Sequence, residues 1–337
     1  MPAEDPVKRV WERAVDIDSI EPAGEDAVVP FAIEALDTRG RAIQMGPALN
    51  RILSRHDYPP PVARLLGEMI VLTVLLGTSL KFEGQFIVQT QTDGPVSLLV
   101  VDFRTPAAIR AYARFEKEAL DAAIEAGETL PEQLLGNGIL AMTIDQGVYM
   151  NRYQGMVPLE GKTLEEVAHA YFLQSEQIPT RIRLGVAELV SPNGNGGSAS
   201  SWRAGGVIVQ FLPESEDRIR HRDLHGGDGA EDIEHDEDNA WIEAQALLAT
   251  VEDHELTDPD IRVERLLFRL FHEQGIRLFD PQPVEDKCSC SGEKIWSVLN
   301  SMTDDQLEEV VKDGRIEVKC EFCGKDYSIS PDDLKRR

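Results

Sequence analysis

Residues 62–80 read VARLLGEMIVLTVLLGTSL, and the architecture of the chain is built around this stretch. Its two charged residues, Arg64 and Glu68, stand near its start, and the remainder is apolar on most sides of a helix. A helix that is apolar nearly all round is buried between other elements. The prolines at 59–61 fix their own φ angles and restrict the residues before them, so they predict a stiff, non-helical segment ahead of it.

The segments that follow this helix alternate between apolar and polar residues or are rich in β-branched residues, as strands are. Asp93-Gly94 and Gln146-Gly147 are turn signals that predict two hairpins. The predicted strands are 86–91, 96–101, 139–144, 148–157, 180–190 and 206–212, with a Gly/Asn/Ser loop over 192–201. Helix 62–80 and the strand residues Phe86 and Val88 are interpreted as core rather than as an exposed binding surface.

Several helices are predicted from their caps and periodicity. Thr163 and Glu166 form a capping box that opens a helix to about residue 175. A helix over 240–251 is followed by Thr257-Asp258-Pro259-Asp260, which we expect to cap a helix over 261–274 that ends at Gly275. Residues 276–279 predict a short strand. Helices over 293–300 and 303–312 follow, the second with a Thr303…Gln306 capping box and a stop at Gly314. Strands with segregated helices predict an α+β fold.

The length of the chain and the changes in composition along it divide the 337 residues into four parts. We expect an N-terminal mixed α+β core domain over 1–213 and a helical linker region over 240–280. Residues 281–337 predict a small four-cysteine domain. Residues 214–239 carry eleven acids and three arginines and predict an acidic insertion. Its histidines (His221, His225 and His235) are an alternative metal site, but no helical register organises them and a solvated loop is the favoured interpretation.

The net charge of the chain limits the classes of partner that we expect it to bind. Lys plus Arg is 34 and Asp plus Glu is 60, so the formal charge is 34 − 60 = −26. A basic face is needed to bind phosphates or anionic lipids, so we expect no nucleic acid and no membrane partner. The N-terminus has no basic flank before an apolar stretch, and the most apolar run is Met69–Leu76. A cytoplasmic protein is therefore expected.

The four cysteines are Cys288, Cys290, Cys320 and Cys323, with 29 residues between the C-x-C and C-x-x-C pairs. Their confinement to the C-terminal part of a long chain indicates a metal or redox site rather than a disulfide scaffold. Four thiolates suit one tetrahedral Zn²⁺, and Gly324 lets the backbone fold back behind the second pair. Such a closed site has no open position for hydrolysis. Thiolates are also the form that oxidants attack, so oxidation would remove the metal's ligands.

Alternatives remain at this point. Cys320 and Cys323 alone could form a thioredoxin-like redox motif, which would make the protein a thiol-disulfide oxidoreductase. The four thiols could be free and buried, and a zinc ribbon that binds nucleic acid is disfavoured by the charge. No other catalytic constellation stands out, so no enzyme is expected.

The chain resembles the 33 kDa heat-shock chaperonin family, the redox-regulated holdases of the bacterial cytoplasm. The resemblance rests on the cysteine spacing and on motifs spread through most of the chain. These motifs are His56-Asp57-Tyr58-Pro59, Leu80-Lys81-Phe82-Glu83-Gly84, Gln91-Thr92-Asp93-Gly94-Pro95, Gly136-Asn137-Gly138, Arg152-Tyr153-Gln154-Gly155, Ser175-Glu176-Gln177-Ile178-Pro179-Thr180-Arg181, Phe279-Asp280-Pro281-Gln282 and Val284-Glu285. The acidic N-terminal extension and the 214–239 insertion fall outside it.

The resemblance implies a mechanism. The reduced protein binds one Zn²⁺ through the four cysteines and is inactive. Oxidation pairs Cys288 with Cys290 and Cys320 with Cys323, releases the zinc, unfolds the C-terminal domain and loosens the linker. The protein then binds unfolding clients without ATP, as a homodimer. We expect the client surface to be one stripe of helix 261–274, hidden while zinc is bound, formed by Val263, Leu266, Leu267, Leu270 and Phe271.

Overall fold

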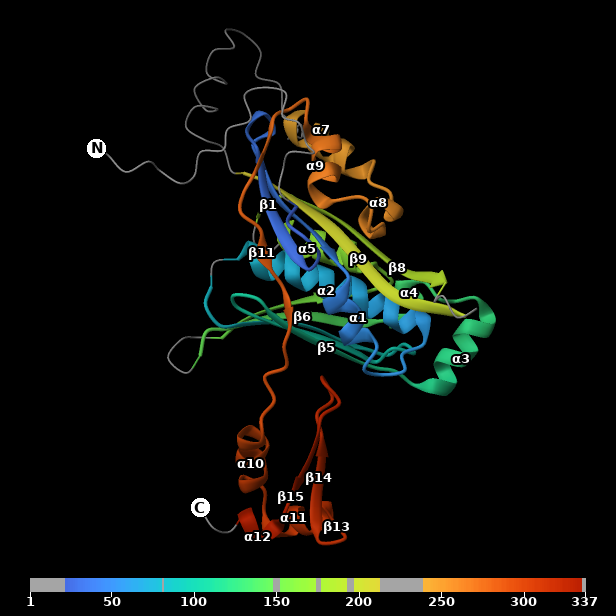
Figure 1. The fold of residues 1–337 in the computed structure, drawn as a ribbon, viewed down its shortest axis with the longest axis vertical. Helices are drawn as coiled ribbons and strands as arrows, with labels where there is room; N and C mark the ends of the chain where they lie inside the picture. The colour runs from blue at the N-terminus through green and yellow to red at the C-terminus, as the bar shows by residue number, and fades with distance from the viewer. Residues whose placement is uncertain are drawn as a thin grey trace, which may run out of the picture.

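The protein is described from a computed structural model that covers residues 22–80, 82–147, 152–173, 177–192, 197–212 and 239–334. The acidic insertion lies almost wholly outside these ranges, as do its three histidines. Two mainly antiparallel sheets, a central helix and an outer layer of helices form the body of the molecule, and a separate lobe holds the four cysteines (Figure 1).

Helix α2 (Pro60–Ser79) is the predicted apolar helix, and it lies between the two sheets. Two prolines occupy its first turn, where a missing N–H costs nothing. Apolar side chains such as Leu72 are wholly buried, in one hydrophobic cluster with Ile43 of one sheet and Val88 of the other. At Gly77 an added Cβ would lie 2.6 Å from the Phe103 ring, so close packing requires glycine there. Phe86 and Val88 are buried, which confirms their interpretation as core.

Sheet A lies on one side of α2. Its strands, in spatial order, are β10 (Ile276–Leu278), β1 (Ala27–Ile33), β2 (Thr38–Met45), β9 (Ser198–Phe211) and β8 (Thr180–Pro192), and β11 (Gln282–Pro283) also pairs with β1. The sheet is covered on both faces. Ile43 and Ile208 face α2, whereas Phe31 and Val209 face the outer helices. A strand that is buried on both faces loses its alternation, as β9 does.

Sheet B lies on the other side of α2. Its order is β12 (Glu285–Asp286), β5 (Ala108–Arg114), β4 (Leu98–Arg104), β3 (Gln85–Thr92), β6 (Gly138–Asp145) and β7 (Tyr153–Pro158). The predicted hairpins are present, since β3 pairs with β4 and β6 with β7. The shorter body helices are α1 (Pro47–Leu53), α3 (Lys117–Ala126), α4 (Pro131–Leu135), α5 (Leu164–Tyr171) and the 3₁₀ turn η2 (Glu34–Leu36). The predicted capping box of Thr163 and Glu166 opens α5.

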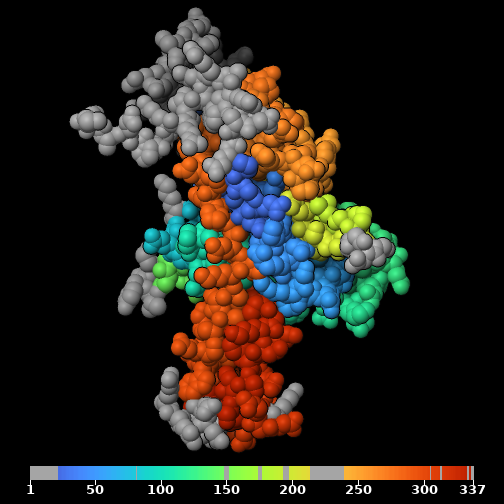
Figure 2. All heavy atoms as spheres, viewed as in Figure 1, coloured from blue at the N-terminus to red at the C-terminus, as the bar shows by residue number. Residues whose placement is uncertain are grey.

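Three helices cover the outer face of sheet A. They are α7 (Asn239–Ala249), α8 (Asp253–Thr257) and α9 (Val263–Phe271). An extended segment, residues 276–287, then leads from α9 to the cysteines, and we call it the strap. The strap contains β10, β11 and β12, so it pairs first with sheet A and then with sheet B. Figure 2 shows it as an orange band that runs over the surface between the outer helices and the C-terminal lobe.

The C-terminal lobe, residues 288–334, is called the cysteine module here. It holds α10 (Gly292–Asn300), α11 (Asp304–Val310), β13 (Val311–Lys312), β14 (Arg315–Lys319), β15 (Asp326–Ile329) and α12 (Pro331–Leu334). Its three strands form a separate antiparallel sheet. Among its described side chains, Leu299, Ile316 and Leu334 form the buried cluster, so its core is small.

The α+β fold is confirmed, and several boundaries differ from the prediction. Strands β1 and β2 were not predicted, because burial on both of their faces hides the alternation. Strand β9 begins at Ser198, inside the predicted loop, because the exposed polar end of this long hairpin resembles a loop in composition.

Two predicted helix boundaries were also wrong, namely the start of α9 and the end of α11. Thr257 ends α8, and α9 begins at Val263, because Asp258 accepts a hydrogen bond from the Asp260 amide at 2.8 Å and forms a turn between them. Helix α11 stops at Val310, since the next two residues pair with β14. Asp313 and Gly314 have positive φ angles of 50° and 76° and form the hairpin turn.

Helix α2 is also long and apolar enough to cross a membrane by length and composition alone. However, 78% of its apolar window is buried inside the protein. Its position between two sheets accounts for its hydropathy, because both sides of the helix must match apolar neighbours.

A candidate metal centre and the helix stripe above it

The structure brings the four predicted cysteines together. Cys288 and Cys290 follow the strap, and Cys320 and Cys323 lie in the turn between β14 and β15. All four sulfur atoms lie within 4.8 Å of one another. Cys288 Sγ is 3.8 Å from Cys320 Sγ, and Cys290 Sγ is 3.3 Å from Cys323 Sγ. Residues that are about thirty positions apart in sequence thus form one compact donor set.

The turn between β14 and β15 positions the second pair. The Gly324 amide donates to the Cys320 carbonyl at 2.8 Å, and the Cys320 amide donates to the Lys325 carbonyl at 2.9 Å. Gly324 has a φ of 71°, which a residue with a Cβ rarely adopts. The sequence-based interpretation of Gly324 as the residue that lets the chain fold back is confirmed.

The donor set fits a tetrahedral metal ion. Four sulfurs at about 2.3 Å from one Zn²⁺ lie about 3.8 Å from one another. The Cys288–Cys320 separation matches this value, and the Cys290–Cys323 separation is slightly shorter. The site could therefore hold one metal ion with four thiolate ligands, which leaves no open coordination position.

The environment of the site shifts the pKa values of its thiols in different directions. Burial raises the pKa of Cys288, against the opposing hydrogen bond from Arg110. Burial and hydrogen bonds with the other thiols raise the pKa of Cys323 to about 12. Burial also acts to raise the pKa of Cys290, but hydrogen bonds from Tyr327 and the other thiols lower it to about 7. The pKa of Cys290 is thus lowered toward neutral pH, whereas the pKa values of Cys288 and Cys323 are raised.

Two residues that the sequence did not single out contact the sulfurs. The Tyr327 hydroxyl on β15 donates to Cys290 Sγ at 3.2 Å. Arg110 on β5 lies in the body, yet its Nη1 is 3.8 Å from Cys288 Sγ. Tyr327 lies four residues beyond Cys323 and could have been suspected from that proximity. Arg110 had no such signal, because 178 residues separate it from Cys288.

Two clefts are lined in part by the cysteines. One of about 390 Å³ is lined by Arg110, Lys287 and Cys288, and another of about 500 Å³ is lined by Cys290, Ile295 and Val298, among others. All four cysteines are half-buried rather than fully enclosed. A small oxidant could therefore approach the sulfurs without a large rearrangement.

The predicted stripe of α9 lies against sheet A. All five of its residues are at most 5% exposed, namely Val263, Leu266, Leu267, Leu270 and Phe271. The Phe271 ring stacks on Phe31 of β1 with a centroid separation of 5.8 Å. The stripe is thus hidden in this state of the protein, whereas the cysteines lie in a different lobe.

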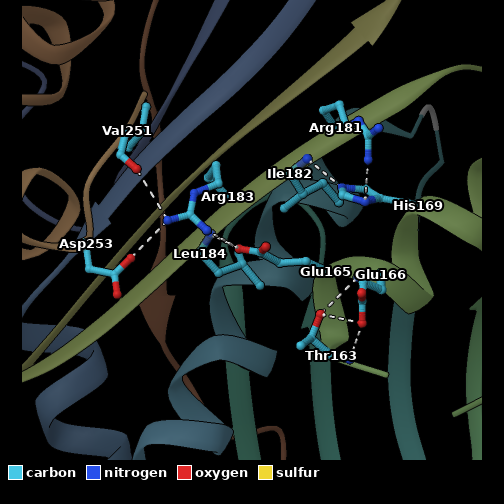
Figure 3. Close-up of polar contacts among 10 residues, drawn as sticks. All are labelled: Thr163, Glu165, Glu166, His169, Arg181, Ile182, Arg183, Leu184, Val251 and Asp253. Carbon is cyan, nitrogen blue, oxygen red and sulfur yellow. Dashed lines mark hydrogen bonds and ion pairs between the residues drawn. The ribbon is translucent and has the colours of Figure 1, made fainter. Parts of the chain in front are cut away.

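Polar contacts hold the outer helices on β8 (Figure 3). Arg183 Nη2 donates to Asp253 at 3.1 Å and to the Val251 carbonyl at 3.3 Å, and its Nη1 lies 3.6 Å from Glu165. This arginine therefore ties α8 and the end of α7 to β8 and α5. Because the contacts are half-exposed, they add modestly to the apolar packing of the stripe.

A second group lies beside it. The Ile182 amide donates to His169 Nε2 at 2.8 Å (Figure 3). Arg181 Nε donates to Gln245 of α7 at 2.6 Å. Burial lowers the pKa of His169 to about 4, and the nearby Arg181 charge acts in the same direction. His169 is therefore neutral when the outer helices are docked.

The position of the C-x-x-C motif also bears on the alternative function. Cys320 and Cys323 lie in a turn between two strands of a small sheet. Thioredoxin-like motifs lie in βαβ folds, and helix N-termini are among the settings that lower a cysteine's pKa. The local structure here is a turn between two strands, which could supply two ligands to one metal ion.

Comparison with known proteins identifies the family. A family model described as "Hsp33 protein" matches residues 26–330. The 33 kDa chaperonin of Caulobacter vibrioides strain NA1000 is 44% identical over 310 residues, which cover 91% of this chain and 95% of the relative. That of Photorhabdus laumondii is 35% identical over 313 residues, 92% and 95% of the two chains. The chain belongs to the Hsp33 family.

A solved structure shares the fold. The crystal structure of the 33 kDa chaperonin from Thermotoga maritima superposes with a TM-score of 0.67 over 92% of this chain and 97% of that one. The two sequences are 18% identical, so the likeness concerns the fold alone. The names of the relatives support a chaperone function, in keeping with the expectation of a protein that is not an enzyme.

Proposed function

We propose that this Hsp33-family protein is a redox-regulated, ATP-independent holdase of the cytoplasm. Reduced, it holds one Zn²⁺ through Cys288, Cys290, Cys320 and Cys323 and is inactive. The convergence of these four sulfurs within 4.8 Å is the observation that supports the proposal most strongly. A bound zinc ion would supply the cross-link between the two halves of the module and keep the sulfurs as thiolates.

The oxidative step forms two disulfides, which the family resemblance places between Cys288 and Cys290 and between Cys320 and Cys323. Each disulfide forms when two thiolates give up two electrons to one molecule of hydrogen peroxide, which takes up two protons from the solvent and becomes two molecules of water. The sulfurs then no longer act as thiolate ligands. The half-buried cysteines and the clefts beside them are compatible with attack by a small peroxide.

Unfolding of the module is the expected consequence. A module of about fifty residues has little core of its own and depends on a staple. Its described buried cluster of Leu299, Ile316 and Leu334 is small, and it cannot replace four metal–sulfur bonds. The strap begins at the first cysteine pair and ends at α9, so loss of the module would free the segment that leads to the stripe.

The α9 stripe is the proposed client surface. Its residues Leu267 and Leu270 face sheet A in the closed protein. Their release would expose a contiguous apolar face, which is the kind of surface that unfolding proteins bind. The active, oxidised form is proposed to be a homodimer.

The test uses light scattering from a heat-denaturing client protein, mixed with reduced, zinc-loaded protein or with protein treated with peroxide. We expect only the oxidised form to suppress scattering, with release of one zinc per chain in a chromogenic assay and formation of dimers in sedimentation. Suppression by both forms, or by neither, would contradict the proposal. Turnover in an insulin-reduction assay would favour the oxidoreductase instead.

A further inference from the structure

Phe322 lies between the two cysteines of the C-x-x-C motif, and it points toward the body rather than into the module. The guanidinium carbon of Arg110 is 4.1 Å from the centroid of its ring. The Tyr112 ring lies 6.5 Å away, and His56 packs against Tyr112 at 5.7 Å in an edge-on arrangement. We call Arg110, Tyr112 and His56 the Phe322 seat.

The seat is built into sheet B. Arg110 and Asp102 are directly opposite each other on β5 and β4. Arg110 Nε donates to Asp102 Oδ2 at 2.6 Å, and Asp102 is only 3% exposed. This ion pair fixes the guanidinium plane over which an aromatic ring can stack. The same arginine reaches Cys288 with its other nitrogen, so it contacts both cysteine motifs.

The end of the strap lies directly beside the seat. Strand β12 pairs in parallel with β5, with Glu285 opposite Ala108 and Asp286 opposite Ile109. The Lys287 amide donates to the Ile109 carbonyl at 3.0 Å. Arg51 and Arg55 both pair with Asp286, whose side chain is 2% exposed. The module and the strap are therefore anchored on adjacent residues of one strand.

We propose that the seating of Phe322 on Arg110 and Tyr112 is an autoinhibitory contact that keeps the strap closed in the reduced protein. This inference rests on the proposed function. The position of Phe322 depends on the turn that carries Cys320 and Cys323. A Cys320–Cys323 disulfide draws these sulfurs to about 2.05 Å and removes them from the four-sulfur cluster. The turn then rearranges, Phe322 leaves its seat, and the strap opens from its β12 end toward α9.

The inference makes a prediction that needs no oxidant. Removal of the ring should loosen the strap while all four thiols remain reduced. The test measures hydrogen–deuterium exchange of the reduced, zinc-loaded full chain in peptides that cover the strap (276–287) and α9. Phe322→Ala should raise exchange of the strap amides about tenfold, the change expected from loss of one partly desolvated cation–π contact. Phe322→Leu keeps apolar volume and should have a smaller effect.

Controls come from the body. Arg104 is an exposed residue of β4 that lines the same cleft of about 390 Å³ as Arg110 and Cys288. Arg104→Gln should leave hydrogen exchange of the strap unchanged. Arg110→Gln is combined with Asp102→Asn, because the single change would leave a buried carboxylate without a partner. This double variant should loosen the strap as Phe322→Ala does. Adding Phe322→Ala to it should cause no further increase, since both changes break the same contact.

The outcomes separate this inference from the proposed function. Strap exchange that stays at the wild-type rate in Phe322→Ala, while peroxide still raises it, would overturn the inference. If Phe322→Ala unfolds the module itself, the Asp102/Arg110 double variant decides, because its changes lie in the body. Failure of the oxidised wild-type protein to suppress aggregation would contradict the proposed function. Hydrogen exchange of the reduced variants would still decide whether the Phe322 seat holds the strap.

Discussion

The body and the cysteine module are held together by different means. In the body, α2 is buried between two sheets, and residues such as Leu72 and Val88 have no exposed surface. In the module, the described buried cluster consists of Leu299, Ile316 and Leu334. Burial of apolar area contributes about 25 cal/mol per Å², so a small lobe gains little from it. We therefore expect the body to remain folded if a chemical change at the four sulfur atoms unfolds the module.

The strap is where the two regions meet. It is held by strand pairing, by the ion pairs of Asp286, and by Ile276 and Val284, which are buried in the two hydrophobic clusters of the body. Elements with few buried apolar contacts open at lower free energy than core elements do. We therefore expect the strap to open at lower free energy than α2, and it is the part of the chain that joins the body to the module.

The largest expected effect comes from metal removal. Chelation of the reduced protein should unfold residues 288–334, because metal binding supplies about 10–16 kcal/mol in small zinc modules. Hydrogen exchange should then rise throughout the module, whereas α2 peptides stay protected. A compact module in protein shown to be metal-free and reduced would remove the contrast between the two regions.

The second test exposes the apolar stripe of α9 by substitutions that leave the sequence of the cysteine module unchanged. Leu267→Ser together with Leu270→Ser buries two hydroxyls and removes apolar contacts with sheet A, at a cost of about 2–5 kcal/mol for each site. We expect α9 to undock in the reduced state, and either zinc-dependent repression or client capture should change in the scattering assay. Ile242→Ser on α7, where the side chain is 45% exposed, is the matched control. Wild-type repression and capture in the double variant would exclude this surface.

The third test addresses the body. Leu72→Ala leaves a cavity between the two sheets and should lower the free energy of unfolding by about 2–5 kcal/mol. Chemical denaturation followed by far-UV circular dichroism measures the loss, and zinc affinity should not change. Leu173→Ala, at a side chain that is 63% exposed, serves as the control. A large loss of zinc affinity in Leu72→Ala would show that the two regions are not independent.

The smallest effect concerns pH. Burial lowers the folded-state pKa of His169 to about 4, so the unfolded chain takes up a proton that the folded chain does not. Stability from this residue is present above about pH 6.5 and is lost as the pH falls toward 4. The loss should be on the order of 1–2 kcal/mol after allowance for solvent screening.

This pH test requires a difference measurement, because Glu68 acts in the opposite sense. Burial, together with Glu165, raises the pKa of Glu68 to about 7. We therefore expect the gap in unfolding free energy between wild type and His169→Gln to shrink from pH 7 to pH 4. His272→Gln, at an exposed histidine at the end of α9, controls for histidine content. A gap that does not vary with pH would contradict the buried, neutral state of His169.

Much of the fold was predictable from local patterns. Helix α2, the two hairpins of sheet B and the capping boxes at Thr163 and Thr303 all appear where the sequence predicted them. These features depend on neighbours within a few residues, such as a hydroxyl three positions before a Glu or Gln. Strands β1 and β2 were missed because burial on both faces removes the alternation that marks a strand.

The cysteine spacing predicted that these four residues form one site, with a C-x-x-C redox motif or free thiols as alternatives, and the structure brings the four sulfurs within 4.8 Å of one another. It could not reveal that Arg110 contacts Cys288 or that Phe322 rests on β5. Those contacts depend on how the strap crosses from one sheet to the other, which is set by pairing between strands far apart in sequence. Neighbouring residues in the sequence are enough to identify the cysteine motifs. The contact between the module and the body forms only when long-range strand pairing brings β5 beside the module.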